Sequence, residues 1–402
     1  MKRLAILAGF AAALMLSAGA QAQTNKDTVK IGVLTDMSSL YADLGGPGSV
    51  AAAQMAVADF GGTVNGKKIV VVSADHQNKP DIGASIARQW FDTDGVDMIT
   101  DLTTSSVALA VQEVAREKKK VLMITGAASS DLTGKSCAPT SIHYAYDTTA
   151  LANGTGAAVV KAGGNTWFFI TADYAFGHAL QRDTASVVVA NGGKVVGSVN
   201  VPLNTADFSS YLLQAQASKA KIIGLANAGG DTINSIKQAA EFGIVKGGQK
   251  LAGLLLFISD VHSLGLKIAQ GLQLTGSFYW DQDEQTRAFS KKFFAKTGKE
   301  PTMTQAGVYS AVMHYLEAVK ATNSVDGPTI VKYLRSKPIN DFMIRNGHLQ
   351  ADGSLVHDMY LYEVKTPAES KGPWDLYKLV ATIPGAEAYK RPHGDQCPLA
   401  KD

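Results

Sequence analysis

The chain has little cysteine, no strong excess of either charge, and no long apolar run beyond its first residues. Its 38 basic and 35 acidic residues give a formal net charge of +3, which offers no electrostatic basis for binding nucleic acid. The sequence contains no HExxH, no GxSxG and no His/Cys cluster with metal-ligand spacing, so we expect no enzyme, no metal site and no cofactor.

The apolar run at the N-terminus indicates export. Lys2 and Arg3 precede apolar residues 4–16, and a small-residue stretch ends at Ala22. The run is shorter than the roughly 20 apolar residues of a membrane-spanning helix. It therefore predicts a secretory signal peptide, residues 1–22, cleaved after Ala22; a single-pass anchor is the alternative. No cysteine stands directly after Ala22 to carry a lipid anchor, so we expect a soluble periplasmic protein.

The two cysteines, Cys137 and Cys397, are too far apart in sequence for a CxxC redox or zinc motif. Export would place them in an oxidising compartment, where disulfides form and persist. We therefore expect one Cys137–Cys397 disulfide, which would hold the proline-containing C-terminal tail. Two unpaired buried thiols are the alternative.

Short β-branched runs alternate with longer amphipathic stretches along most of the chain, a pattern typical of βαβ units around a parallel sheet. The first series predicts strands at 29–34, 68–74, 98–101 and 121–125, with helices at 47–60, 80–93 and 106–118. After a less regular stretch, 137–147, a second series predicts helices at 149–162, 177–191, 209–217 and 231–242, with strands at 166–172, 194–199, 221–226 and 250–256. Three helices (284–297, 304–320, 328–336) and a β-rich tail (358–364, 376–382) follow.

At about 380 residues the mature chain is too long for one ordinary core. The pattern predicts two doubly wound, Rossmann-like α/β lobes with a ligand cleft between them. We assign residues 27–145 plus 276–355 to the N-terminal lobe and 146–275 plus 356–402 to the C-terminal lobe. Ligands of open parallel sheets bind outside the carboxyl ends of the strands, so the loops there are the candidate site.

Four consecutive hydroxyl residues, 103–106, follow one predicted strand at the start of a helix. Free backbone N–H groups, the helix dipole and side-chain hydroxyls can together hold a carboxylate without arginine. Ordinary helix capping by one hydroxyl is the alternative. The small residues of 125–130, after the next strand, would let a ligand approach backbone donors closely.

Other strand ends carry aromatic and polar residues. Tyr174 and Phe176 follow a strand of the second lobe, and Asn227 and Asp260 follow two more. Such aromatics are often core residues, yet their shared position favours ligand contact. Residues 46–51 fit GxGxxA, but they lie roughly ten residues beyond the strand, whereas a dinucleotide site needs a tight turn.

Several segments together resemble the branched-chain amino-acid-type periplasmic binding proteins of ABC importers: the export signal and residues 30–34, 45–48, 103–106, 125–129 and 173–177. The resemblance implies two type I lobes joined by a three-segment hinge. It also implies a solute carboxylate held by Thr104 and Ser105 and by Ala127 and Ser129.

The resemblance is less close at the positions that determine which ligand binds. The family's second-lobe aromatic falls at Phe176, with Tyr174 beside it, but its further aromatic falls near Ala228, where this chain has no ring. The acid that pairs with an amino-acid ammonium would fall at Ser259 or Asp260. These departures make the chain similar to a subgroup associated with aromatic acids, whose ring could stack on Tyr41, Tyr174 or Phe176.

We therefore expect a monomeric solute-binding receptor that captures a small carboxylate-bearing solute by lobe closure and delivers it to the membrane permease of an ABC importer. A ligand-sensing receptor of the same fold is the alternative, and an enzyme is a weaker one. The candidate ligand-binding residues are Ser39, Tyr41, Thr104, Ser105, Ala127, Ser129, Tyr174, Phe176, Asn227 and Asp260.

Overall fold

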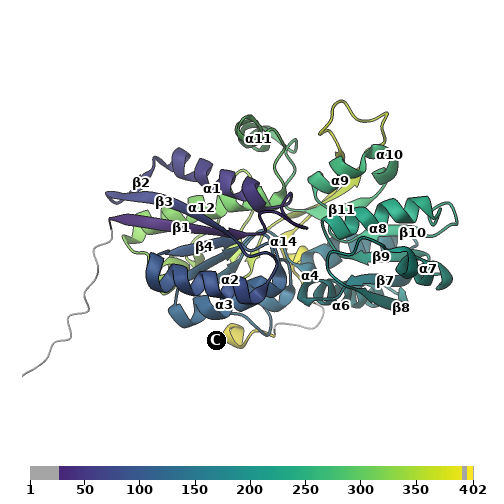
Figure 1. Cartoon of the computed structure of the whole chain (residues 1–402), viewed down its shortest axis with the longest axis horizontal. Coiled ribbons are helices and arrows are strands. Elements are labelled where there is room, and N and C mark those ends of the chain that lie inside the picture. Colours follow the sequence, from purple (N-terminus) through teal and green to yellow (C-terminus); the bar gives the residue numbers. More distant parts are fainter. Residues whose placement is uncertain (1–26, 392–395, 402) are drawn as a thin grey trace, which may run out of the picture.

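The structure is a computed structural model that describes residues 27–391 and 396–401. The expected signal peptide, residues 1–22, lies outside the described residues. Two α/β lobes lie side by side, and segments far apart in sequence meet in each of them (Figure 1). Within the described ranges, no helix has the length and apolar character needed to cross a membrane.

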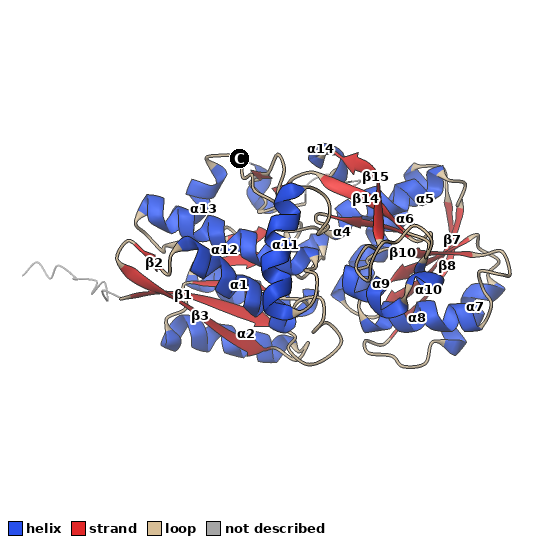
Figure 2. Ribbon diagram, turned by 90° about the horizontal axis from the view of Figure 1, so that it is seen from above, coloured by secondary structure: helices blue, strands red, loops and turns tan. Residues whose placement is uncertain are grey.

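The first lobe is built on a six-stranded sheet in the order β2-β3-β1-β4-β5-β6. All neighbouring strands are parallel except β2 and β3. Helix α12 packs along α1, and α13 contacts both α12 and β5 (Figure 2). The elements are β1 (Thr28–Thr35), α1 (Gly46–Phe60), β2 (Thr63–Val64), β3 (Lys67–Asp75), α2 (Pro80–Gln89), β4 (Met98–Asp101), α3 (Ser105–Lys118), β5 (Val121–Ile124), β6 (Ser141–His143), α11 (Glu284–Thr297), α12 (Met303–Thr322) and α13 (Gly327–Arg335).

The second lobe contains a four-stranded parallel sheet in the order β10-β9-β7-β8. Its helices alternate with the strands along the chain, as in the first lobe. The elements are α4 (Thr148–Leu151), α5 (Ala157–Lys161), β7 (Thr166–Ala172), α6 (Ala175–Ala190), β8 (Lys194–Val201), α7 (Ser209–Ala217), β9 (Ile222–Ala226), α8 (Gly230–Glu241), β10 (Lys250–Gly253), α9 (Ile258–Leu264) and α10 (Leu266–Ala269).

A separate antiparallel sheet, in the order β11-β14-β15, brings the tail of the chain beside the second lobe. A two-stranded hairpin, β12 with β13, lies between β11 and β14 in the sequence. The elements are β11 (Gln273–Gly276), β12 (His348–Leu349), β13 (Leu355–Val356), β14 (Met359–Val364), β15 (Tyr377–Ile383) and α14 (Gly385–Ala388).

Local sequence explains where the helices begin and end. Pro47 stands at the start of α1, where a missing N–H costs little, and Gly61 ends that helix in the left-handed region at φ 104°. Asp283 caps α11 by accepting a hydrogen bond from the Thr286 N–H at 2.9 Å. Thr302 caps α12 by accepting one from Gln305 at 3.2 Å.

The two-lobed α/β architecture expected from the sequence is confirmed, and the differences are local. The stretch expected to be irregular contains β6, whose three residues are buried and pair with β5. The helix expected at 80–93 is α-helical to Gln89 and continues as a π-helical turn, Trp90–Asp94. That turn buries the rings of Trp90 and Phe91, so tertiary packing sets its geometry. Residues 258–262, expected as a loop, begin α9.

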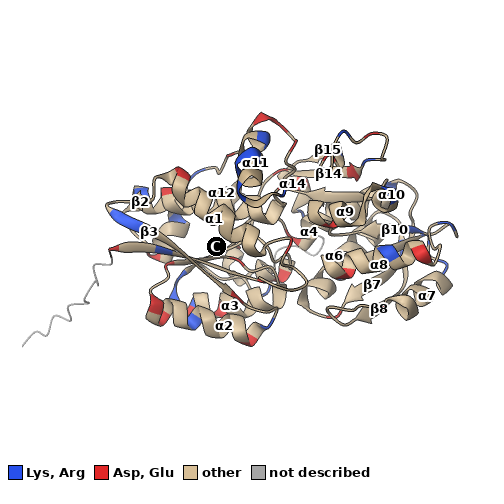
Figure 3. Cartoon of the chain, turned by 45° about the horizontal axis from the view of Figure 1, so that its top comes forward, with Lys and Arg blue, Asp and Glu red and all other residues tan. Residues whose placement is uncertain are grey.

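Charged residues occur mainly on the outer helices and connecting loops (Figure 3). The central strands explain this distribution, because all four residues of β5 and all five of β9 are buried and only apolar or small. A parallel strand that is covered on both faces therefore has a continuous apolar sequence. Some of the buried polar groups, such as Asp36, Asp101 and Thr125, lie where these parallel strands end.

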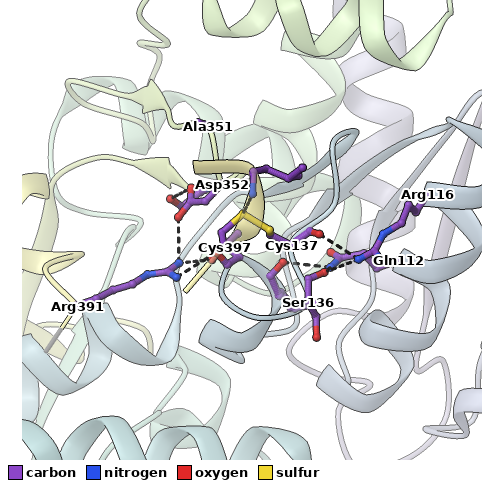
Figure 4. The surroundings of a disulfide bond; sticks show 12 residues. Gln112, Arg116, Ser136, Cys137, Ala351, Asp352, Arg391 and Cys397 are labelled. Carbon is purple, nitrogen blue, oxygen red and sulfur yellow. Dashed lines mark hydrogen bonds and ion pairs between the residues drawn. A yellow bond between two sulfur atoms is a disulfide. The ribbon is translucent and has the colours of Figure 1, made fainter. Parts of the chain in front are cut away.

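The disulfide expected between Cys137 and Cys397 is present, with the two Cα atoms 5.7 Å apart (Figure 4). It joins the end of the chain to the first lobe, and Arg391 fastens the same region. The Arg391 guanidinium pairs with Asp352 at 3.1 Å and donates to the Thr133 carbonyl at 3.0 Å. Covalent and polar contacts therefore hold the tail together.

A buried histidine on α12 predicts a pH-dependent stability. His314 contacts Glu317 at 3.1 Å and Asp341 at 3.3 Å. Burial opposes its protonation, but hydrogen bonds and charges from Asp341 and Glu317 outweigh burial and raise the pKa of His314 to about 9. A pKa raised on folding gives stability that is fully present below the unfolded value of about 6.5 and is lost as the pH rises through 9.

We therefore compare the unfolding free energies of the native protein and of His314→Gln. The difference, native minus variant, should decrease by about 3 kcal/mol between pH 6 and pH 10. Urea denaturation of both proteins across this range measures the difference, which cancels the titration of shared groups. Parallel pH profiles would contradict the ion-pair assignment.

Candidate ligand-binding site

A cavity, with about 220 Å³ of space between its atoms and partly open to solvent, lies between the two lobes, at the carboxyl ends of strands from both sheets. Five of the twelve lining residues are aromatic and none is charged. The lining residues are Tyr41, Leu44, Thr103, Ser105, Gly126, Ala128, Tyr146, Tyr174, Phe176, Ala228, Leu255 and Phe257.

The loop after β1 carries Tyr41 into the cavity, and the buried carboxylate of Asp36 organises that loop. Asp36 accepts hydrogen bonds from the Tyr41 N–H at 2.8 Å, the Ser39 N–H at 2.9 Å and the Asn78 side chain at 2.7 Å. Burial raises the pKa of Asp36, but these hydrogen bonds outweigh it and hold the pKa below its usual value. Asp36 is therefore ionised and fixes the position of Tyr41.

The hydroxyl of Thr103 is oriented as a hydrogen-bond donor. Burial lowers the pKa of His76 to about 4, so its ring is neutral. Its Nδ1 accepts from the Asn78 N–H at 3.0 Å, which places the ring proton on Nε2. Thr103 Oγ1 therefore accepts from His76 Nε2 at 3.2 Å and from the Asp36 N–H at 3.3 Å. Both lone pairs are used, and the hydroxyl hydrogen is left for the cavity.

Ser105 is oriented in the same way. Its Oγ accepts hydrogen bonds from the backbone N–H groups of Ala128 and Ser129, both at 3.2 Å. Its hydroxyl hydrogen is likewise left for an acceptor in the cavity. Ser105 is also the first residue of α3, so the free N–H groups and positive dipole end of that helix lie at the same place.

Contacts across the cleft hold the lobes closed. The hydroxyls of Tyr41 and Tyr174 lie 2.7 Å apart and join the first lobe to the second. Beside the cavity, Arg182 of α6 contacts Asp131 at 3.1 Å and donates to Ser130 at 2.8 Å. A ligand in this cavity is therefore enclosed by both lobes.

Aromatic rings form most of the remaining wall. Tyr174 and Phe176 lie with ring centres 5.9 Å apart, and Tyr146 meets Phe257 edge to face at 6.3 Å. The Tyr146 hydroxyl donates to the Gly126 carbonyl at 2.6 Å, so it is already occupied. The cavity therefore offers two hydroxyl donors at one end and flat apolar surfaces elsewhere.

A buried acid stands directly behind this polar end. A Cβ on Gly126 would lie 2.7 Å from the Asp101 carboxyl, so only glycine leaves room there. Burial raises the pKa of Asp101 to about 7, and the hydroxyls of Ser49 and Thr35 offset burial only in part. Below that pH Asp101 is mostly neutral and does not oppose an anion in the cavity.

The structure brings four of the ten sequence-selected residues together in the cavity: Tyr41, Ser105, Tyr174 and Phe176. Three others lie next to the cavity and make hydrogen bonds that support its wall. The Thr104 hydroxyl donates to the Asn78 side chain. The Ala127 carbonyl contacts His143 Nε2 at 2.8 Å, and the Ser129 N–H is bound to Ser105.

The other three selected residues lie elsewhere. Ser39 and Asp260 line a separate outer groove between the lobes, where Ser39 bonds to Asp36 and Asp260 accepts the Phe257 N–H at 2.9 Å. Asn227 accepts from the Thr232 hydroxyl at 2.7 Å, at the start of α8.

Sequence reasoning did not select eight of the lining residues. Thr103 belongs to the predicted hydroxyl run 103–106, but Thr104 and Ser105 were selected from that run instead. Tyr146 follows β6, and its only signal was an aromatic pair, Tyr144 and Tyr146, in a stretch expected to be irregular. The others are mostly apolar or small: Leu44, Gly126, Ala128, Ala228, Leu255 and Phe257.

Comparisons with known proteins agree with this geometry. Residues 28–373 match the family described as "Periplasmic binding protein". A periplasmic binding protein from Burkholderia mallei is 57% identical, with a TM-score of 0.92, and the match covers 93% of this chain and 100% of that chain. A branched chain amino acid ABC transporter periplasmic ligand-binding protein from Burkholderia xenovorans LB400 is 44% identical, with a TM-score of 0.83 and the same coverage of both chains.

A third solved structure shows the likeness of fold alone. It is a solute binding protein of an ABC transporter from Rhodopseudomonas palustris BisB5, in complex with 3,4-dihydroxy benzoic acid, and it is 23% identical with a TM-score of 0.81 over 92% of this chain and 99% of that chain. The resemblance seen in the sequence is confirmed by the family match. The chain belongs to the periplasmic binding protein family.

Proposed function

We propose that this protein is the periplasmic receptor of an ABC importer for a small aromatic carboxylic acid, which it releases to a membrane permease without chemical change. The observation that carries the proposal is the pair of hydroxyl donors, Thr103 and Ser105, at the start of α3. Two hydroxyl donors beside a helix N-terminus, both on residues that line the cavity, suit the two oxygens of a carboxylate.

The rest of the cavity favours an aromatic acid over an amino acid. Tyr41, Tyr146, Tyr174, Phe176 and Phe257 surround the space in which the solute's body would lie. Flat rings stack or meet edge to face with such side chains, at about 0.5–1.5 kcal/mol per pair beyond burial.

The ammonium of an amino acid would need a carboxylate partner in the cavity, and no acidic residue lines it. The two nearest candidates of the second lobe are already engaged. Asp231 accepts the backbone N–H groups of Asn204 and Thr205, and Asp260 accepts that of Phe257. An unpaired buried ammonium would be costly, so leucine and its relatives should bind weakly.

Thermal-shift measurements with benzoate, 4-hydroxybenzoate, leucine and glucose test the proposal. A ligand of the native state at 100 times its Kd stabilises by about 2.7 kcal/mol, which raises the Tm by several degrees in a saturable way. We expect this for an aromatic acid and not for leucine or glucose, with the acid recovered unchanged. Stabilisation by leucine alone, or conversion of the acid to a product, would contradict the proposal.

A further inference from the structure

A second space, with about 280 Å³ between its atoms and partly open to solvent, adjoins the ligand cavity at Phe257. Its wall is mainly apolar and includes Leu256 and Leu274 of the second lobe with Met303 at the start of α12. Phe257 lines both this space and the ligand cavity. Phe257 is buried, and its ring packs edge to face against Tyr146 of the ligand cavity, so Phe257 stands between the two spaces.

The second space is bordered by polar groups without partners. The Tyr377 hydroxyl is buried, lines the space and makes no hydrogen bond within residues 27–391 and 396–401. One oxygen of Glu300 and the hydroxyl of Ser277 are also buried without a partner in the described residues, and both residues are next in sequence to lining residues. Buried polar atoms without partners are rare in native proteins, so their gathering here indicates room for a guest.

Leu44 of the ligand cavity also lines the outer groove between the lobes, away from the second space. The polar end is closed by α3 and Asp101, and the mouth by the Tyr41–Tyr174 pair. Phe176 is as deeply buried as Phe257 but lines the ligand cavity only. A solute anchored by its carboxylate can therefore gain length toward Phe257, which the second space adjoins.

We infer that Phe257 sets the length of the solute that the site accepts, by closing off the second space. Removal of its ring joins the two compartments and creates a site for an aromatic acid with an alkyl extension. The choice of an acid as ligand rests on the proposed function, whereas the partition by Phe257 does not.

The test compares Phe257→Ala with Phe176→Ala, because each removes one buried phenyl ring and only the first opens the second space. Calorimetry gives the Kd ratio of benzoate to 4-propylbenzoate for both variants and the native protein. We expect Phe257→Ala to shift this ratio toward 4-propylbenzoate by about 50-fold, as burial of three methylene groups implies. Phe176→Ala should leave the ratio within about threefold.

Neutral propylbenzene serves as a second probe that needs no carboxylate recognition. Phe257→Ala should bind it at least about tenfold more tightly than Phe176→Ala, since joined apolar space accepts apolar guests. If acids bind none of the three proteins but propylbenzene discriminates between the variants, the partition stands and the proposed function fails. Equal responses of the two variants to both probes would overturn the inference. Phe257→Val replaces Phe257→Ala if circular dichroism shows that the alanine variant does not fold.

Discussion

Replacing Thr103 by valine and Ser105 by alanine together should weaken binding of the aromatic acid by about 3–6 kcal/mol, roughly 10²–10⁴-fold in Kd. Each change removes one hydroxyl donor to a charged group, worth about 1.5–3 kcal/mol. The N-terminus of α3 remains, so binding should persist at high concentration of the acid. Isothermal titration calorimetry with the acid that stabilises the native protein most measures the loss.

Two single variants serve as controls for that result. Thr103→Ser keeps the hydroxyl and should stay close to the native affinity. Thr104→Val removes the neighbouring hydroxyl, which bonds to Asn78 instead of lining the cavity, and should lower affinity far less than the double change. A double variant that binds within threefold of the native protein would show that the carboxylate is held elsewhere.

Replacing Cys137 and Cys397 together by serine should lower the unfolding free energy by about 5 kcal/mol on the chain-entropy account. The bond closes a loop with a sequence separation of 260 residues, and the entropy that a cross-link removes from the unfolded chain grows with loop length. Neither cysteine lines the ligand cavity, so the Kd for the acid should change less than about threefold. Guanidinium denaturation with and without saturating ligand measures both effects.

Reduction provides the matched control for the disulfide. Dithiothreitol should lower the stability of the native protein toward that of the double-serine variant and leave the variant unchanged. A loss below about 1 kcal/mol would mean that the packing of the tail and the contacts of Arg391 with Thr133 and Asp352 hold this region without the bond.

Much of the fold was predictable because local patterns and tertiary structure agree. Alternating apolar strands and amphipathic helices predicted two α/β lobes, and two cysteines in a chain expected to be exported predicted the disulfide between them. Loops after parallel strands converge at one edge of each sheet, so Tyr41, Ser105, Tyr174 and Phe176 could be placed in a site before any coordinates.

The rest depended on features that sequence does not encode locally. Asp101 and Leu102 both adopt positive φ, 79° and 60°, at the end of β4. Non-glycine residues rarely do so, and the resulting turn puts Thr103 instead of Thr104 in the cavity. Phe257 and Leu255 belong to a segment after β10 whose apolar sequence is typical of hydrophobic core residues. Their position in the cavity wall becomes apparent only from the closed arrangement of the two lobes.

A crystal structure of the protein with the acid that gives the largest thermal shift tests the central claim most directly. The account predicts the carboxylate between the two lobes, within hydrogen-bonding distance of the Thr103 and Ser105 hydroxyls, with the aromatic ring among Tyr41, Tyr174 and Phe176. A ligand bound in the outer groove, or one whose carboxylate turns away from the start of α3, would contradict it.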